Sequence, residues 1–292
     1  MGHSRWRALP FVILLGIILG LGPVVVRFSL RQFQPVGFRF FQYLVGSFFF
    51  LLVYFLRRQK LPTDPILWRR AGMMGFVTVC AILGVILALQ YLSSGVVSLI
   101  LTLIPVAVAI LAHRFLPDEK LTIRRLIGAL VAFSGVGLVL LRSETGLAEL
   151  TTIDPRGVIY CSVAILGFAV YMIYARRYLG DWSGQDVIAV RSFCAMLILL
   201  PLAWYFGGFE LQNVSWEGWL AVITMGVGFS YGAYQLEFFI IKRYGATVTS
   251  QVNYLSPLAA AIAGALFLGE QFTIVILLGM AIVFAGLRIL NT

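Results

Sequence analysis

Residues 98–135 read SLILTLIPVAVAILAHRFLPDEKLTIRRLIGALVAFSG, and residues 250–286 repeat them as SQVNYLSPLAAAIAGALFLGEQFTIVILLGMAIVFAG. The two copies stand 152 residues apart up to Leu116 and 151 residues apart from Glu119 onward. Apolar matches between two hydrophobic segments are weak evidence. The informative matches are a proline, a glutamate followed by a threonine, and two glycines: Pro105/Pro257, Glu119/Glu270, Thr122/Thr273, Gly128/Gly279 and Gly135/Gly286. The chain is therefore predicted to consist of two homologous halves.

The composition indicates a membrane protein. Hydrophobic residues make up 61% of the chain and charged residues 12%, and the mean hydropathy is +0.96. A soluble domain holds roughly 45–50% apolar residues. About 20 consecutive apolar residues span a bilayer as a helix. Ten such windows are present: 8–28, 36–56, 71–91, 94–113, 123–141, 157–175, 186–206, 216–239, 246–268 and 272–290. The fold class is therefore all-α integral membrane, with ten transmembrane helices and five in each half.

The positive charges predict the orientation of the two halves. Sixteen of the 22 Lys and Arg residues fall in segments on the same side of the bilayer as the N-terminus, and five fall on the other side. By the positive-inside rule both termini are cytoplasmic. The 57–70 connection carries five positive charges, whereas its counterpart 207–215 carries none. Homologous units with opposite charge bias indicate two inverted five-helix repeats.

The predicted domains follow from this repeat. The first repeat covers 8–141, an inter-repeat loop covers 142–156, and the second repeat covers 157–290. The basic start and apolar run at 8–28 resemble a signal peptide, but no small-residue cleavage site follows, so this run is kept as a span. The net charge of +10 is assigned to orientation and to anionic lipid head groups, not to a nucleic-acid partner.

Two windows carry polar stripes. Residues on one face of 246–268 are Ser250, Asn253, Tyr254 and Pro257, and 94–113 repeats the stripe more weakly with Ser98, Thr102 and Pro105. A polar stripe finds no hydrogen-bond partner in lipid, so it faces protein or a water-filled cavity. Contact with a ligand and hydrogen bonding between helices are both open explanations.

Glu237 is an acidic residue deep inside a predicted span, and Ser230 and Tyr234 share its face. A carboxylate there is costly unless it is protonated, paired or wetted. It either leans toward Lys242 or Arg243, or binds a substrate ammonium group or exchanges protons during transport. Five tyrosines could wall a cavity beside it: Tyr171, Tyr174, Tyr231, Tyr234 and Tyr254.

Arg39 and Arg191 open two equivalent windows, 152 residues apart. Both are expected close to an end of an apolar run. They either snorkel toward the interface, as capping or anchoring charges, or serve as anion-binding or gating charges.

No catalytic or cofactor motif is recognisable, so the chain is not expected to be an enzyme. His3 and His113 are too few for a metal cluster, and Cys80, Cys161 and Cys194 are scattered singles in apolar runs. No P-loop is present. We therefore expect no cofactor, no metal and no ATP site, and uphill transport would depend on an ion or substrate gradient.

The repeated segments resemble those of the EamA-type drug/metabolite transporters over essentially the whole chain. The features that carry the resemblance are the Pro of the fourth and ninth windows, the Glu before the fifth and tenth, and the Gly within those two. The resemblance implies a central cavity walled by helices 1, 3, 4, 6, 8 and 9, with helices 5 and 10 outside. It implies that Pro105 and Pro257 lie near the cavity and that Glu119 and Glu270 are structural residues at helix ends. The Trp-Gly pair often seen in helix 1 of this family is replaced here by Leu19–Gly22.

The function predicted from these observations is secondary transport of small organic metabolites by alternating access of the two halves, with amino acids as the first substrates and export as the direction. The expected setting is the cytoplasmic (inner) membrane, with proton coupling and a homodimer as candidate features. One alternative is a carrier of phosphorylated sugars or nucleotide sugars, which needs several cavity-facing Lys or Arg residues. Another is a non-transporting membrane scaffold or receptor with a filled, apolar core.

Overall fold

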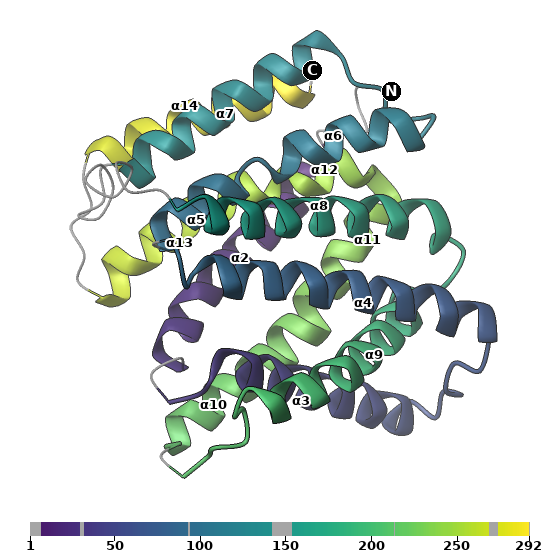
Figure 1. Ribbon diagram of the computed structural model, residues 1–292. Helices are drawn as coiled ribbons and strands as arrows, with labels where there is room; N and C mark the ends of the chain where they lie inside the picture. The colour runs from purple at the N-terminus through teal and green to yellow at the C-terminus, as the bar shows by residue number, and fades with distance from the viewer. Residues whose placement is uncertain are drawn as a thin grey trace.

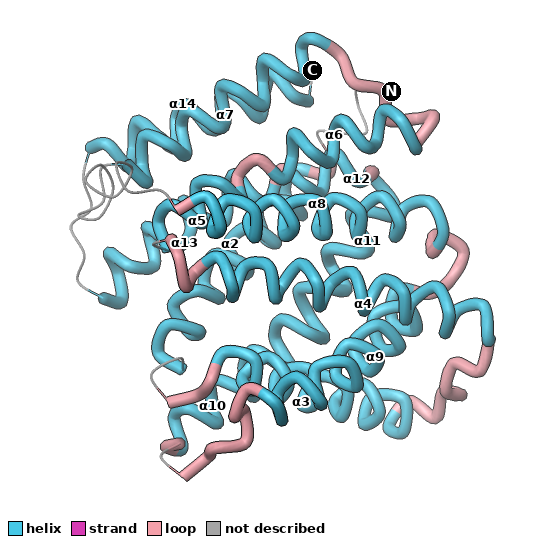
Figure 2. Tube along the Cα trace, viewed as in Figure 1, coloured by secondary structure: helices cyan, strands magenta, loops and turns pink. Residues whose placement is uncertain are grey.

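The computed structural model describes residues 7–29, 32–92, 94–141, 154–212, 214–268 and 274–291. This part of the chain contains helices and connections and no strand (Figures 1 and 2). The helices are α2 (Leu9–Ser29), α3 (Pro35–Leu56), α4 (Pro65–Ala88), α5 (Ser94–Leu101), α6 (Ile104–Phe115), α7 (Ile123–Leu141), α8 (Pro155–Tyr178), α9 (Gly184–Tyr205), α10 (Trp216–Thr224), the π-helix η2 (Met225–Ala233), α11 (Tyr234–Tyr244), α12 (Ala246–Ser250), α13 (Val252–Leu268) and α14 (Ile274–Asn291). Each of the ten predicted windows lies on one or more of these helices.

Among the described residues, four helices are long and apolar enough to cross a membrane, namely α3, α4, α8 and α9. Shorter apolar helical stretches are Leu9–Gly22, Ile104–Phe115 and Leu277–Leu290. The all-helical, membrane-spanning class is thereby confirmed. The count of ten spans, the inverted orientation of the halves and the cytoplasmic termini stay predictions.

Three of the four long helices begin with the same local device. Pro35, Pro65 and Pro155 each stand at the first helical position, and the side chain of the preceding residue accepts hydrogen bonds from the first turn. Proline is suited to this place because its missing N–H would have no intrahelical partner there. The capping side chains are Gln34, Asp64 and Asp154, which satisfy N–H groups that the helix itself leaves free.

The sequence predicted one continuous helix for each of the two proline-bearing windows, but in the structure each window is broken into two helices. The 94–113 window divides into α5 and α6 at Thr102 and Leu103, just before Pro105. Pro105 has no N–H to continue the ladder, so the helix restarts there. The 246–268 window divides into α12 and α13 at Gln251, ahead of Pro257. The two breaks stand at different distances from their prolines, so the repeat is not exact here.

Helices α7 and α14 form a pair that lies side by side at one edge of the molecule (Figure 1). Small residues let their backbones approach closely. A Cβ added at Gly135 would lie 2.8 Å from the Gly279 carbonyl oxygen, and one added at Gly286 would lie 2.5 Å from the Ala132 nitrogen. These repeated glycines therefore pack the last helix of one half against the last helix of the other. Packing between α7 and α14 of the same chain therefore explains these glycines, and a homodimer is not needed to explain them.

The remaining helices pack against one another in several pairs. Helix α2 packs along α13, where a Cβ at Gly20 would lie 2.5 Å from the Ala259 Cβ. Helix α4 packs against both α8 and α9, and α3 packs against α9 and η2. The connections α3–α4, α6–α7 and α8–α9 gather at the same edge of Figure 1. The first two are the strongly basic connections of the first half, so positive charge is concentrated at one end of the bundle.

Candidate functional site

A cluster of polar and charged side chains lies inside the bundle, where α3, α8, α9 and α11 converge. We call it the arginine–glutamate cluster, and it consists of Tyr43, Tyr171, Arg191, Tyr234 and Glu237. Arg191 is 1% exposed and Glu237 is 7% exposed, so two opposite charges are held away from water. Such charges are rare inside membrane proteins and mark functional sites by default.

Hydrogen bonds connect the two charges through a tyrosine. Arg191 Nη1 donates to the Tyr171 hydroxyl at 3.1 Å, and this hydroxyl donates to Glu237 Oε2 at 3.0 Å. The Arg191 guanidinium carbon also lies 4.1 Å from the centre of the Tyr234 ring, a cation–π arrangement. The ring of Tyr43 stacks on Tyr234 with 6.5 Å between centres and 13° between planes. The cation is thus held by a hydrogen bond on one side and by a ring face on another.

The cluster is not fully satisfied. The Nε and Nη2 groups of Arg191 are buried without a hydrogen-bond partner, and so is the hydroxyl of Tyr43. A buried donor left without a partner costs about 1–3 kcal/mol, and more when it is charged. Groups of this kind, buried inside the bundle, are available to a ligand or to water.

The placement of Arg191 differs from the expectation from sequence. It lies roughly two turns inside α9, and at 1% exposure it does not snorkel toward an interface, so that alternative is wrong. The predicted window and α9 begin only two residues apart, so the burial of Arg191 comes from the helices that pack around it and not from its place along the helix. Arg39, its repeat equivalent, is only partly buried and donates to Gln42 Oε1 at 2.8 Å.

The π-helix η2 changes the register just before Tyr234. A π-helical turn holds more residues than an α-helical turn, so the faces on either side of it are rotated. Ser230 lies in η2 and accepts from Gln42 Nε2 at 3.4 Å, whereas Tyr234 and Glu237 begin α11 and face Arg191 and Tyr171. The sequence predicted that Ser230, Tyr234 and Glu237 share one helix face. In the structure Ser230 meets Gln42, whereas Tyr234 and Glu237 meet Arg191 and Tyr171. The structure does not favour the alternative that Glu237 leans toward Lys242 or Arg243. Glu237 accepts from Tyr171, whereas Lys242 donates to the Trp182 carbonyl oxygen and Arg243 lies over the rings of Phe239 and Tyr244.

The polar stripe of α12 and α13 is bonded mainly to its own backbone. Ser250 Oγ donates to the Thr247 carbonyl oxygen, and Asn253 Nδ2 donates to the Ser250 carbonyl oxygen. Tyr254 is fully buried and its hydroxyl has no hydrogen-bond partner, whereas Pro257 is partly buried. Whether any of these residues meets a ligand stays a prediction. The break at Gln251 separates Ser250 from the other three, which a continuous helix would have kept on one face.

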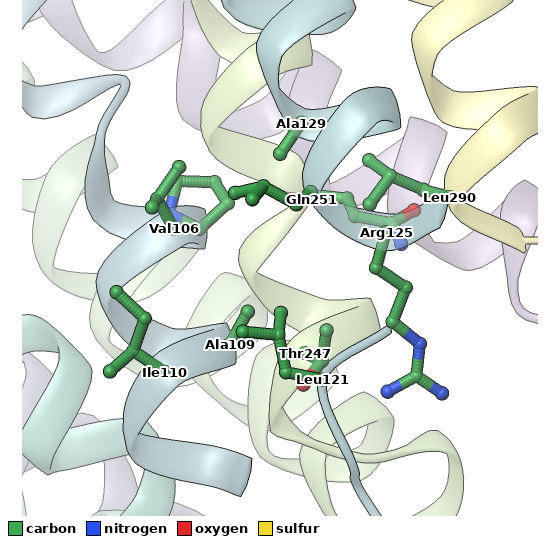
Figure 3. A pocket seen from close by; sticks show the side chains of 11 residues that line it. Val106, Ala109, Ile110, Leu121, Arg125, Ala129, Thr247, Gln251 and Leu290 are labelled. Carbon is green, nitrogen blue, oxygen red and sulfur yellow. The ribbon is translucent and has the colours of Figure 1, made fainter. Parts of the chain in front are cut away.

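A small cavity lies beside α6 (Figure 3), and one residue of the weaker stripe borders it. Pro105 lines this cavity together with residues of α6, α7, α14 and the α12–α13 junction. Its volume is about 20 Å³, which accommodates a water molecule and no metabolite. Thr102 is buried at the helix break and Ser98 is partly buried one turn earlier. Tyr174 lies away from the cluster and packs on Tyr178, with 4.9 Å between ring centres.

Glu119 joins the two halves at the basic end. Its carboxylate accepts hydrogen bonds from the backbone N–H groups of Ala246 at 2.8 Å and Thr247 at 2.7 Å. It thus caps the N-terminus of α12 in the other half, where Gly245 turns the chain with φ +103°. The expected structural role is consistent with this contact, although the helix end that Glu119 caps is α12 and not a neighbouring end along the chain. Glu270 lies outside the described residues.

Tyr43 and Gln42 were missed by the sequence reasoning. The sequence feature that could have identified them is that they form a polar pair one turn after Arg39, inside the apolar window 36–56. In the described part of the chain no group of three or more His, Cys, Asp or Glu residues is placed to hold a metal ion.

Comparison with known proteins supports the same class of protein. The sequence profile of the EamA-like transporter family matches residues 6–141 and 155–292. The uncharacterized transporter YdfC of Bacillus subtilis (strain 168) is 24% identical over 267 residues, which is 89% of this chain and 83% of that protein. Protein PecM of Dickeya dadantii (strain 3937) is 25% identical over 241 residues, covering 80% of this chain and 76% of PecM.

Two further similarities concern export and fold. A probable terminal-alkyne amino-acid exporter of Streptantibioticus cattleyicolor is 26% identical over 206 residues, covering 69% of this chain and 65% of that protein. A solved crystal structure superposes with a TM-score of 0.79, covers 95% of this chain and 94% of its own, and is 18% identical. At that identity the likeness shows the fold alone.

Proposed function

Since the chain belongs to the EamA-like transporter family, we propose that it exports small organic metabolites, with amino acids as the first candidates. The observation that carries the proposal is the arginine–glutamate cluster, in which opposite charges and unpaired donors lie between helices of both halves. A transport site is expected at the interface of the repeats near the middle of the bilayer. The amino-acid exporter among the relatives supports the choice of first substrates.

The proposed mechanism is alternating access. Arg191 and Glu237 are almost completely buried, so substrate reaches them only when helices on one side of the cluster separate. At the basic end the halves are joined through Glu119 and α12, and through Arg176 and Asp118, whose charged atoms are 3.0 Å apart. Release of these contacts would open the cluster toward the basic end, which is the cytoplasmic side by the positive-inside rule.

The alternatives have less support. A phosphorylated sugar would need several cations around one site, whereas Arg191 is balanced by Glu237. A scaffold would have a filled, apolar core, whereas these helices enclose charges and unpaired polar atoms. The proposed setting is the cytoplasmic membrane, with both termini in the cytoplasm.

Transport by purified protein tests the proposal. The full chain is reconstituted in liposomes, and efflux of a broad panel of amino acids and other metabolites is measured with and without a pH gradient. Efflux of an amino acid or another small metabolite above that of empty liposomes is expected, and no efflux across the panel would overturn the proposal. If Glu237 exchanges protons, Glu237→Gln should abolish the dependence on the gradient. Tyr174→Phe, a change outside the cluster, should retain it.

A further inference from the structure

The two unpaired donors of Arg191 lie on one edge of the guanidinium group. Nη1 is engaged by Tyr171, whereas Nε and Nη2 are both free and both buried. These two nitrogens form one of the planar edges that bind a carboxylate through two parallel hydrogen bonds. Two donors of unrelated geometry would suit two waters. A matched pair on one edge suits a carboxylate.

The charge of the cluster restricts the ligand further. Arg191 and Glu237 together are neutral, and they are connected through the Tyr171 hydroxyl. A buried site resists net charge because charge is poorly solvated there. A simple carboxylic acid anion would leave one uncompensated negative charge, and a simple amine one positive charge. A zwitterion preserves neutrality, since its carboxylate meets Arg191 and its ammonium group meets Glu237.

We infer that this site recognises zwitterionic α-amino acids, with the Nε/Nη2 edge of Arg191 binding the α-carboxylate and Glu237 binding the ammonium group. This inference rests on the proposed function and names the chemistry by which the same site selects its substrate. The Tyr171 hydroxyl engages Nη1, and the centre of the Tyr234 ring lies 4.1 Å from the guanidinium carbon, so neither contact uses the hydrogens of Nε and Nη2. They fix the direction in which a carboxylate is accepted.

The test uses compounds that differ in one charged group. Thermal stabilisation of the detergent-purified full chain is measured with each of the standard amino acids. For those that stabilise it, three analogues are added: the amide without the carboxylate, the decarboxylated amine, and the acid without the amino group. Each analogue is expected to bind about 10–100-fold more weakly, because each loses a charge-assisted interaction. Amides or amines that bind as well as the amino acid would overturn the carboxylate assignment, and acids that bind as well would overturn the ammonium assignment.

Variants locate the recognition. Arg191→Gln should remove the preference for amino acid over amide, and Glu237→Gln the preference for amino acid over acid. Arg39→Gln is the matched control because Arg39 is the repeat equivalent and should leave both preferences intact. If Arg191→Gln does not fold, the analogue series on the unaltered protein still decides the question. Metabolite efflux without these preferences would overturn the inference and leave the proposed function standing. Binding and efflux by no compound would overturn both.

Discussion

Arg39 and Arg191 stand at equivalent places in the two halves, yet their surroundings differ. Arg39 is partly buried and bonds to a neighbour on its own helix, whereas Arg191 is buried among tyrosines and shares a hydrogen-bonded network with Glu237. The first repeat offers no comparable acid, because its acidic residues, Asp64, Asp118 and Glu119, all lie between helices. The repeated glycines thus serve the scaffold in both halves, whereas the repeated arginine gains a buried acidic partner, Glu237, in the second half alone.

The largest loss of stability should come from removing the cation of the Arg191–Glu237 pair. Arg191→Leu leaves the Glu237 carboxylate buried without its cation, which destabilises a protein by about 3–5 kcal/mol. Arg39→Leu, the matched change at a partly exposed site, should cost about 1 kcal/mol or less. The double variant Arg191→Leu/Glu237→Leu should regain most of the loss. Midpoints of thermal unfolding in detergent measure all three, and equal losses for the two single variants would contradict the comparison.

Substitution of the repeated glycines Gly135 and Gly286 should destabilise the protein by similar amounts, whereas substitution of Arg39 and Arg191 should not. Gly135→Val and Gly286→Val both insert side chains where backbone atoms of the facing helix lie under 3 Å from the new Cβ. Overpacking of this kind costs about 1–3 kcal/mol. Gly228→Ala is the control, since a Cβ there meets nothing within 4 Å. Thermal unfolding should show similar losses for the two valine variants and none for the control. A loss at only one of the two glycines would show that the α7–α14 pair is not symmetric.

The scaffold was predictable to a greater extent than the site. The helical character of the ten windows follows from hydropathy, which reflects local backbone and lipid constraints. The close packing of the glycines and the break before Pro105 were not predicted, because they depend on the helix that packs opposite and on the exact backbone path. Glu237 was identified by its charge alone. The burial of Arg191 and the part played by Tyr43 could not be foreseen, since they depend on which helices from the two halves meet. The π-helical turn before Tyr234 was likewise invisible, because no residue type specifies it.

The smallest effect is expected at the joint between the halves. Glu119 is 6% exposed and accepts two backbone hydrogen bonds at the start of α12, so Glu119→Ala leaves the Ala246 and Thr247 N–H groups without this cap. Loss of a helix cap costs about 0.5–2 kcal/mol. Asp118→Ala is the matched control: it also pairs with Arg176, but its side chain is 52% exposed. It should change the unfolding midpoint little, because exposed ion pairs contribute about 0–1 kcal/mol. If the two variants melted together, the Arg176 ion pairs and not the cap would join the halves, and the repeated glutamate would lose its assigned role in the scaffold.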